Sequence, residues 1–398
     1  MDARTDESGV RVGRVSTLRS GMLRTDVLEE PHALEQVTQA WDRLAVRRSR
    51  PFSCPAWLRA WWRHAAPRDA RLRVVVVRDG DEVIGIAPWF LTRDRLGVRA
   101  LRPMGWPICQ GVEPLASDGR ELEVATATGR ALAAGQPPPD VVAFDGIDRR
   151  SPWPGDLARA WPGGHAATLT RYELPTFSLS VPEGLGSESW FASKSRHFRT
   201  KLGYNRRRFL REGGSFRLAT AETLDSDLEA FARLHRARWE SRGGSTYLSE
   251  PVERLLAEAG GALIAAGRFR LWSLDFGGEI ISSHVALRAG TECAYWLGGF
   301  DARYAAMSPS LLGILNVVED ALDAGARRID FGAGSANWKL RFADDEGTLA
   351  WRRVVPQGHR HALARLSLAP GQWRRAAAKR VPVEWQTVVV SLERRILR

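Results

Sequence analysis

The sequence predicts an α/β (α+β) fold built from two similar domains, each a mixed, mostly antiparallel sheet flanked by helices. The chain has 398 residues, more than one hydrophobic core usually holds. Two stretches about half a chain apart, 73–90 and 270–287, share a design of strand, glycine turn and strand. The segment 291–332 has the pattern of a strand, a capped helix and a second strand, which predicts a βαβ unit with parallel strands.

Composition excludes several classes of protein. A hydrophobic content of 44% with 26% charged residues is typical of a globular protein, and no apolar run reaches the ~20 residues of a membrane span. The first twenty residues lack an apolar signal sequence, so we expect a cytoplasmic protein, at most attached to a membrane surface. The three cysteines are far apart, which predicts neither disulfides nor a bound metal.

The predicted order of elements in the first half is two helices, a hairpin, a helix and a strand. The helices cover 31–48 and 55–64, and the hairpin strands cover 71–77 and 82–91. A helix at 120–134 and a strand at 140–147 follow, and Pro175 and Pro182 mark the connection between the halves. We therefore predict a disordered N-terminus at 1–25, an N-terminal domain at 26–175, a C-terminal domain at 176–356 and a basic tail at 357–398.

The second half has a similar hairpin preceded by helices. A cationic helix at 193–211 comes first, followed by helices at 225–242 and 251–266 and by the hairpin at 270–287. In the βαβ unit, Ser308 supplies an N-cap hydroxyl, Pro309 occupies the first helical position and Gly325 ends the helix. Free N–H groups at such a helix start can hold an anion, and small residues let a ligand approach them: Ser308, Ser310 and Gly313.

Net charge of +12 indicates an anionic partner without naming it. The helix at 193–211 holds eight Lys or Arg and no acid, with an apolar stripe on its other face. Nucleotide phosphate, transfer RNA and an anionic membrane all suit such a surface, whereas a charge run is often only a solvated face. The residues that we expect to bind substrate or another anion are Arg196, Arg199, Arg206, Arg238 and Trp239.

Four residues are candidates for catalysis. Lys339 follows the second strand of the βαβ unit, where a cation can neutralise an oxyanion or a phosphate. Asp330 or His284 is the candidate base and Tyr304 the candidate acid, although a buried sheet residue is the commoner role for a histidine such as His284.

The ordered set of motifs resembles the GNAT acetyltransferase superfamily. Specifically, it is similar to the two-domain CelD/BcsL-type members linked to cellulose and exopolysaccharide synthesis, which are related to Fem-type peptidoglycan aminoacyltransferases. The arginine helix at 193–211 is one of the motifs, and the others read PFSCPAWLRAWW (51–62), DGDEVIGIAPWFL (79–91), MGWPICQGVEPL (104–115), LHRARWESRGG (234–244), YWLGGFDARYAAMSPSLLGI (295–314) and RIDFGAGSANWKLRF (328–342).

The resemblance implies tandem GNAT-like domains, in which two parallel strands part, here 292–300 and 327–332. It also implies an acyl-CoA co-substrate, with its pyrophosphate on the loop before the helix. The cofactor-binding residues would then be Leu297, Gly298, Gly299, Ser308, Ser310, Leu311, Leu312 and Gly313. In Fem-type relatives a lysine that corresponds to Lys339 lies among substrate phosphates.

Three functions remain open at this point. The leading hypothesis is transfer of an acetyl or other acyl group from acyl-CoA to an amine or hydroxyl of a sugar, exopolysaccharide or cell-envelope precursor. The second is an aminoacyl-tRNA-dependent enzyme acting on a peptidoglycan precursor, the one case in which we expect a nucleic-acid partner. The third is a non-catalytic scaffold of an exopolysaccharide synthesis machine. The basic tail, with nine Lys or Arg, is expected to pack as a helix or to contact an anionic membrane.

Overall fold

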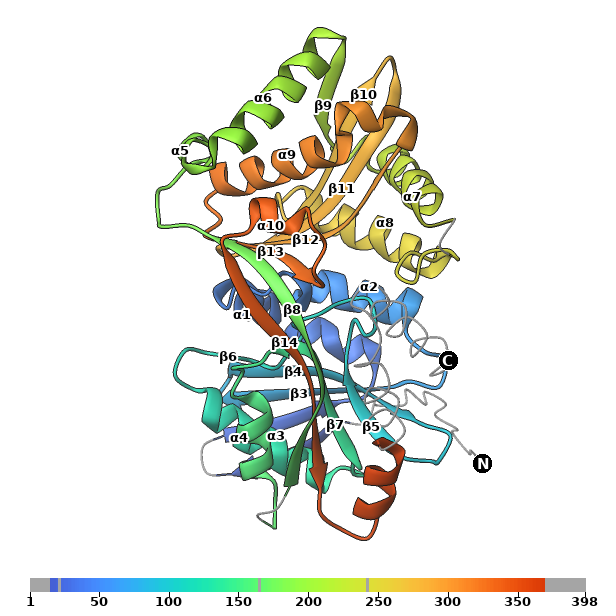
Figure 1. The fold of residues 1–398 in the computed structure, drawn as a ribbon. Helices are drawn as coiled ribbons and strands as arrows, with labels where there is room; N and C mark the ends of the chain where they lie inside the picture. The colour runs from blue at the N-terminus through green and yellow to red at the C-terminus, as the bar shows by residue number, and fades with distance from the viewer. Residues whose placement is uncertain (1–14, 21–22, 164–165, 241–242, 369–398) are drawn as a thin grey trace, which may run out of the picture.

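A computed structural model of the chain describes residues 15–20, 23–163, 166–240 and 243–368. The strands of the described residues form one continuous fourteen-stranded sheet in the order β1-β2-β3-β4-β5-β7-β14-β8-β13-β12-β11-β10-β9, with β6 paired to β4. The two halves of the chain lie at the two ends of this sheet (Figure 1). Within the described residues, no helix is both long enough and apolar enough to cross a bilayer.

The two halves repeat the same order of elements, as the hairpin correspondence predicted. The N-terminal half runs β2 (Leu23–Leu28), α1 (Thr38–Arg47), α2 (Pro55–Ala65), β3 (Arg71–Asp79), β4 (Glu82–Arg93), β5 (Arg99–Pro103), α3 (Glu121–Ala134), β7 (Val141–Asp148), α4 (Trp153–Ala160) and β8 (Ala166–Ser180). The C-terminal half runs β9 (Gly214–Leu218), α7 (Leu224–Glu240), α8 (Glu250–Ile264), β10 (Phe269–Phe276), β11 (Glu279–Ala289), β12 (Glu292–Phe300), α9 (Pro309–Asp323), β13 (Arg328–Ala333), α10 (Lys339–Phe342) and β14 (Asp345–Pro356).

Strand pairing repeats as well. In each half three antiparallel contacts are followed by one parallel contact, between β5 and β7 in the first half and between β12 and β13 in the second. This confirms tandem domains with a parallel strand pair in each. The remaining short elements are β1 (Val15–Ser20), η1 (Pro31–Val37), η2 (Pro51–Ser53), β6 (Leu115–Ala116), α5 (Ser187–Ser193), α6 (Arg196–Arg211) and η3 (Ala302–Met307).

The halves exchange their last strands. β8 follows the N-terminal half in sequence but pairs with β13 of the C-terminal half, and β14 follows the C-terminal half but pairs with β7. The two exchanged strands also pair with each other over nearly their whole length and run side by side through both halves (Figure 1). A buried ion pair between Arg353 of β14 and Asp145 of β7, at 2.7 Å, fixes one of these crossings.

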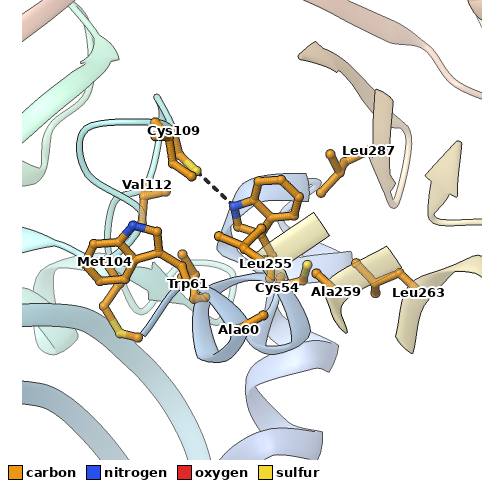
Figure 2. Packing of buried hydrophobic residues seen from close by; sticks show 14 of the residues in the cluster. Cys54, Ala60, Trp61, Met104, Cys109, Val112, Leu255, Ala259, Leu263 and Leu287 are labelled. Atoms are coloured by element: carbon orange, nitrogen blue, oxygen red, sulfur yellow. Dashed lines mark hydrogen bonds between the residues drawn. The ribbon is translucent and has the colours of Figure 1, made fainter. Parts of the chain in front are cut away.

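The helices bury three main hydrophobic clusters. A central cluster packs α1 and α2 of the first half against α7 and α8 of the second, so the two halves share it. Cys109 and the Trp57 indole, whose Nε1 donates to the Cys109 sulfur at 2.9 Å, lie within it (Figure 2). A second cluster lies beneath α3 and α4, and a third lies between β13 and the helices α5, α6 and α9.

Some sequence predictions fail in these regions. Residues 15–20 and 23–25, predicted to be disordered, belong to strands β1 and β2, because β2 finds a partner in β3. The predicted boundary at 175/176 falls inside β8 rather than in a linker. The predicted helix at 193–211 is α6, which starts three residues later, at Arg196, because Ser193 ends the preceding helix α5. In the tail, residues 361–368 are helical and bury Ala364 and Leu368, while 369–398 lie outside the described residues.

Candidate functional site

The site lies where the parallel strands β12 and β13 part. Their pairing runs from Glu292–Arg328 to Ala294–Asp330 and then ends, and β13 continues alongside β8. Beyond Ala294, β12 keeps its antiparallel partner β11 but leaves its other edge without a described strand partner. The predicted parting of 292–300 and 327–332 is therefore confirmed.

A β-bulge shapes the exposed part of β12. Tyr295 pairs with Ala286 and Leu297 pairs with Val285, so Trp296 is an extra residue without a partner on β11. Gly298 and Gly299 follow, and both are required by packing. A Cβ on Gly298 would lie 2.4 Å from the Tyr295 hydroxyl, and one on Gly299 would lie 2.5 Å from the His235 backbone nitrogen. Gly298 leaves room for the Tyr295 and His284 side chains, and Gly299 lets helix α7 approach the strand closely.

The start of α9 differs from the expected capped helix. Ser308 adopts a left-handed conformation with φ 55° and ψ 47°, and its side chain makes no capping hydrogen bond. Its hydroxyl accepts instead from Asn205 Nδ2 of α6, at 3.2 Å. The predicted capping role of Ser308 is therefore wrong. Leu312 is fully buried beneath the helix, and Ser310 and Leu311 are half-buried.

Gly313 has a packing role that the sequence did not reveal. A Cβ at this position would lie 2.2 Å from the His284 ring, so α9 can approach β11 only with glycine there. The sequence predicts that the small size of Gly313 admits a ligand to the helix backbone. In the structure, glycine is required at this position because the His284 ring lies directly beneath α9.

His284 is fully buried and bonded on both sides. Its Nε2 lies 2.9 Å from Ser282 Oγ and its Nδ1 lies 3.0 Å from the Tyr295 hydroxyl. Since the Ser282 hydroxyl donates to the Gly299 carbonyl, it accepts from Nε2–H, and Nδ1 accepts from Tyr295. Burial lowers the pKa of His284 to about 3, so the ring is neutral. With both nitrogens occupied beneath α9, His284 fills a structural role in the resting packing, and its role as a base stays a prediction.

Lys339 lies at the edge of the opening. Its ammonium donates to the carbonyl oxygens of Gly332 and Ala333, each at 2.7 Å, and the residue is only 6% exposed. Burial lowers its pKa to about 8, while the nearby Asp330 carboxylate opposes that shift. Asp330 itself accepts from the Gly332 N–H at 2.8 Å. These two predicted residues therefore come together between the end of β13 and the start of α10.

Aromatic rings join Lys339 to the bulged strand. The ammonium lies 5.8 Å from the Trp338 ring centre, and Trp338 meets the Tyr295 ring edge-on at 5.3 Å. Tyr304, the predicted acid, lies elsewhere, because it packs against Phe276 at the end of β10. Of the four predicted catalytic residues, the structure brings only Lys339 and Asp330 together directly.

The N-terminal half contributes residues that the sequence did not single out. Gln110 Oε1 accepts from the Ala333 N–H at 3.2 Å, next to the carbonyl that holds Lys339. Trp296 Nε1 donates to the Ile108 carbonyl at 3.0 Å. Both contacts come from the loop after β5, which stood out in the sequence as the motif MGWPICQGVEPL (104–115) without a role for either residue.

His235 of α7 was also missed. Its Nδ1–H donates to the Gly298 carbonyl at 3.2 Å, and its Nε2 accepts from the Ser245 hydroxyl at 2.9 Å. The ring is 2% exposed, and burial lowers its pKa to about 4. Ser245 in turn accepts from the N–H groups of Tyr247 and Leu248. His235 thus fastens the loop between α7 and α8 to the bulged strand.

The predicted anion-binding residues fall into two groups. Arg196, Arg199 and Arg206 belong to α6, while Arg238 and Trp239 belong to α7, on the opposite face of the sheet (Figure 1). Arg206 pairs with Glu319 of α9 at 2.5 Å, and the Arg238 guanidinium lies 5.2 Å from the Phe300 ring centre. The structure does not gather them into one site.

A separate cavity of about 420 Å³ lies in the N-terminal half. Its charged lining is largely self-paired, since Arg50 bonds Glu113 at 2.6 Å and Arg48 bonds Glu121 at 3.0 Å. The parting strands β12 and β13 and the buried ammonium of Lys339 lie in the other half, so we place the candidate site there. Over the described ranges, no three His, Cys, Asp or Glu side chains gather as metal ligands would.

Comparison with known proteins agrees with this geometry. The model of the acetyltransferase (GNAT) domain family matches residues 8–99 and 196–340, more than half of the chain. The chain belongs to the GNAT acetyltransferase family. This GNAT protein is an acyltransferase, and family members generally use acyl-CoA. No curated protein matches it in sequence.

Several solved structures share the fold over most of the GNAT chain. FemX has a TM-score of 0.61 at 13% identity, covering 83% of this chain and 98% of its own. The C-terminal domain of a putative lysylphosphatidylglycerol synthetase from Agrobacterium fabrum has a TM-score of 0.53 at 11% identity, with coverages of 83% and 95%. L-PGS from Bacillus licheniformis has a TM-score of 0.52 at 12% identity, with coverages of 86% and 96%. At these identities the likeness is one of fold.

Proposed function

We propose that this acyltransferase moves an acetyl or other acyl group from acyl-CoA to an amine or hydroxyl of a sugar, exopolysaccharide or cell-envelope precursor. The observation that carries the proposal is the opening between β12 and β13, with a bulged strand on one side and the buried ammonium of Lys339 on the other. The N-terminus of α9 follows β12 after the short helix η3, so positive helix-dipole charge is available close to the strand.

The reaction would be direct attack within a ternary complex. The acceptor nitrogen or oxygen bonds to the thioester carbonyl carbon, the carbon–sulfur bond breaks, and the CoA thiolate leaves and takes a proton. Backbone N–H groups at 297–299 would polarise the carbonyl, and the Lys339 ammonium would stabilise the developing negative charge. Asp330, whose side chain is 25% exposed at the same edge, is the candidate base.

The nature of the acceptor rests on two supports. The resemblance to CelD/BcsL-type proteins supports an exopolysaccharide precursor. The fold shared with FemX and with a putative lysylphosphatidylglycerol synthetase supports an acceptor from the cell envelope. Under either support, the acceptor is a molecule that bears a hydroxyl or an amine.

A second candidate is transfer from aminoacyl-tRNA. One specific observation favours it: the cationic helix α6 touches the start of α9 through the bond between Asn205 and Ser308. The phosphates of an aminoacyl-tRNA donor could then bind the Lys and Arg side chains of α6. The fold shared with FemX makes this the natural rival to acyl-CoA.

Titration calorimetry with acetyl-CoA tests the proposal. We expect saturable 1:1 binding to the wild type, followed by release of free thiol when an amine acceptor such as glucosamine is added. Lys339→Met is expected to bind acetyl-CoA but to release thiol far more slowly. No binding of acetyl-CoA at millimolar concentration, together with RNase-sensitive binding of aminoacyl-tRNA, would favour the second candidate and reject the first.

A further inference from the structure

Helix α6 presents a broad cationic surface to solvent. Its sequence from Arg196 to Arg211 contains no Asp or Glu. The exposed cations on it are Arg196, Arg199, Lys201, Arg207 and Arg211. At 3.6 residues per turn, Arg196, Arg207 and Arg211 fall along one line of the helix and the other two flank it. We call these five residues and the exposed side chains between them the α6 face.

The α6 face points away from the fold. The opposite side of the helix buries Leu202 and Phe209, and Phe198 packs against Phe342. In Figure 1, α6 lies at the periphery, beside α9 and next to the edge strand β9. A helix of sixteen residues is ~24 Å long, so the surface is long enough to contact many headgroups at once.

Two large hydrophobic residues lie among the cations. Tyr204 is 54% exposed and Leu210 is 48% exposed, and their helical positions flank the line of arginines. A single exposed apolar residue is ordinary, but here two accompany five cations on one helix. Tyrosine and leucine both enter the boundary between headgroups and acyl chains. For RNA, tyrosine could stack on a base, whereas leucine offers nothing comparable.

Charge also favours an extended anionic surface. Within the helix, Arg206 is already paired with Glu319 and Arg208 with Glu212, and both arginines are less exposed than the five cations of the α6 face. The cations that remain most exposed are those of the α6 face. Basic residues near an anionic bilayer are attracted cumulatively, and the attraction is screened by salt.

We propose that the α6 face is a docking surface for an anionic phospholipid membrane, with the five cations on the headgroups and with Tyr204 and Leu210 at the headgroup–acyl boundary. The inference does not depend on the acyl donor or acceptor. It would hold the enzyme at a bilayer, where acceptors attached to lipid or assembled at the membrane are concentrated.

Vesicle co-sedimentation of the full chain tests the proposal. The probes are vesicles of phosphatidylcholine alone and vesicles containing phosphatidylglycerol. The test variant combines Arg196→Glu, Arg207→Glu and Arg211→Glu. A matched control makes the same change of charge at three exposed arginines outside α6: Arg95, Arg149 and Arg254. Thermal unfolding of both variants checks that each remains folded.

We expect the wild type to bind the anionic vesicles, the α6 variant to bind them on the order of 100-fold more weakly, and the control to lose much less. The double variant Tyr204→Ser, Leu210→Ser is expected to bind anionic vesicles at low salt. It should release them at about 0.5 M salt, because screening then removes the electrostatic attraction. Equal losses in the α6 variant and the control would overturn the proposal. So would α6-dependent binding of total tRNA without binding of anionic vesicles.

Discussion

Replacement of Gly313 by alanine should destabilise the protein, although alanine favours helices. In an exposed helix the change from glycine to alanine stabilises by about 0.5–1 kcal/mol. At Gly313 the new Cβ would lie 2.2 Å from Cδ2 and Nε2 of His284, far inside contact distance. Since Ser282 and Tyr295 hold the ring on both sides, it cannot move without breaking a hydrogen bond.

The magnitude follows from these opposing terms. Overpacking in a core costs about 1–3 kcal/mol. One lost hydrogen bond adds roughly 1 kcal/mol, and the gain in helix propensity subtracts about 1 kcal/mol. The net expectation is a destabilisation of about 2 kcal/mol. With an unfolding entropy of ~2.1 cal/mol/K per residue, a cooperative transition of the whole chain would shift by about 1 °C per kcal/mol.

Gly261 provides the matched control. It lies in helix α8, is exposed, and has no atom within 4 Å of the position where a Cβ would be added. Gly261→Ala should therefore stabilise the protein by about 0.5–1 kcal/mol. Thermal and urea unfolding of the two variants should shift in opposite directions. A Gly313→Ala protein as stable as Gly261→Ala would refute the close packing of α9 on His284.

Five further predictions concern the site and the thiols. Lys339→Met should lower kcat for thiol release on the order of 100-fold, the usual cost of removing one stabilising group from an oxyanion site. Because the pKa of Lys339 is lowered to about 8, wild-type kcat should fall as pH rises through 8, and Lys339→Arg should remove that fall. The same lowered pKa means that the unfolded state binds the extra proton between about 8 and 10.5, so the Lys339 contribution to stability should rise with pH in that range, as urea unfolding would show. His235→Asn, which keeps one of the two ring hydrogen bonds, should lower kcat for thiol release, because His235 supports the strand at Gly298 that is proposed to polarise the acyl carbonyl; an unchanged kcat would contradict that support. All three cysteines are buried with raised pKa values, so a thiol reagent should label the native protein slowly and the denatured protein at three sites.

The sequence predicted the elements whose signals are local. The two hairpins, the helix from Pro309 and the parallel strands on either side of it were all correct, because turn glycines, helix caps and apolar spacing act over a few residues. The exchanged strands β8 and β14 were missed, because each is defined by a partner more than a hundred residues away or in the other half. Pro175 lies within β8, and because proline is rare inside strands it led to the prediction of a connection there.

The site was predictable in outline and not in its contacts. Lys339 and Asp330 stood beside a strand end, so their proximity followed from the local chain. Histidine is a common catalytic base, so the residue type alone could not reveal the structural role of His284. Its burial and its two hydrogen bonds show that role. Gln110 and His235 had no distinguishing local pattern, because their importance arises from contact with β13 and β12.

The duplicated halves have different uses. In the N-terminal half the loop after β5 returns to β7, where the Gly111 N–H donates to the Gly146 carbonyl at 2.8 Å and bridges the parting strands. That same loop reaches the C-terminal half through Gln110 and the Ile108 carbonyl. The N-terminal copy therefore supports the edge on which Lys339 lies, while the exchanged strand β8 pairs with β13 beside it. Since one wall of the opening depends on these contacts, the C-terminal half should not form a competent site when it is expressed alone.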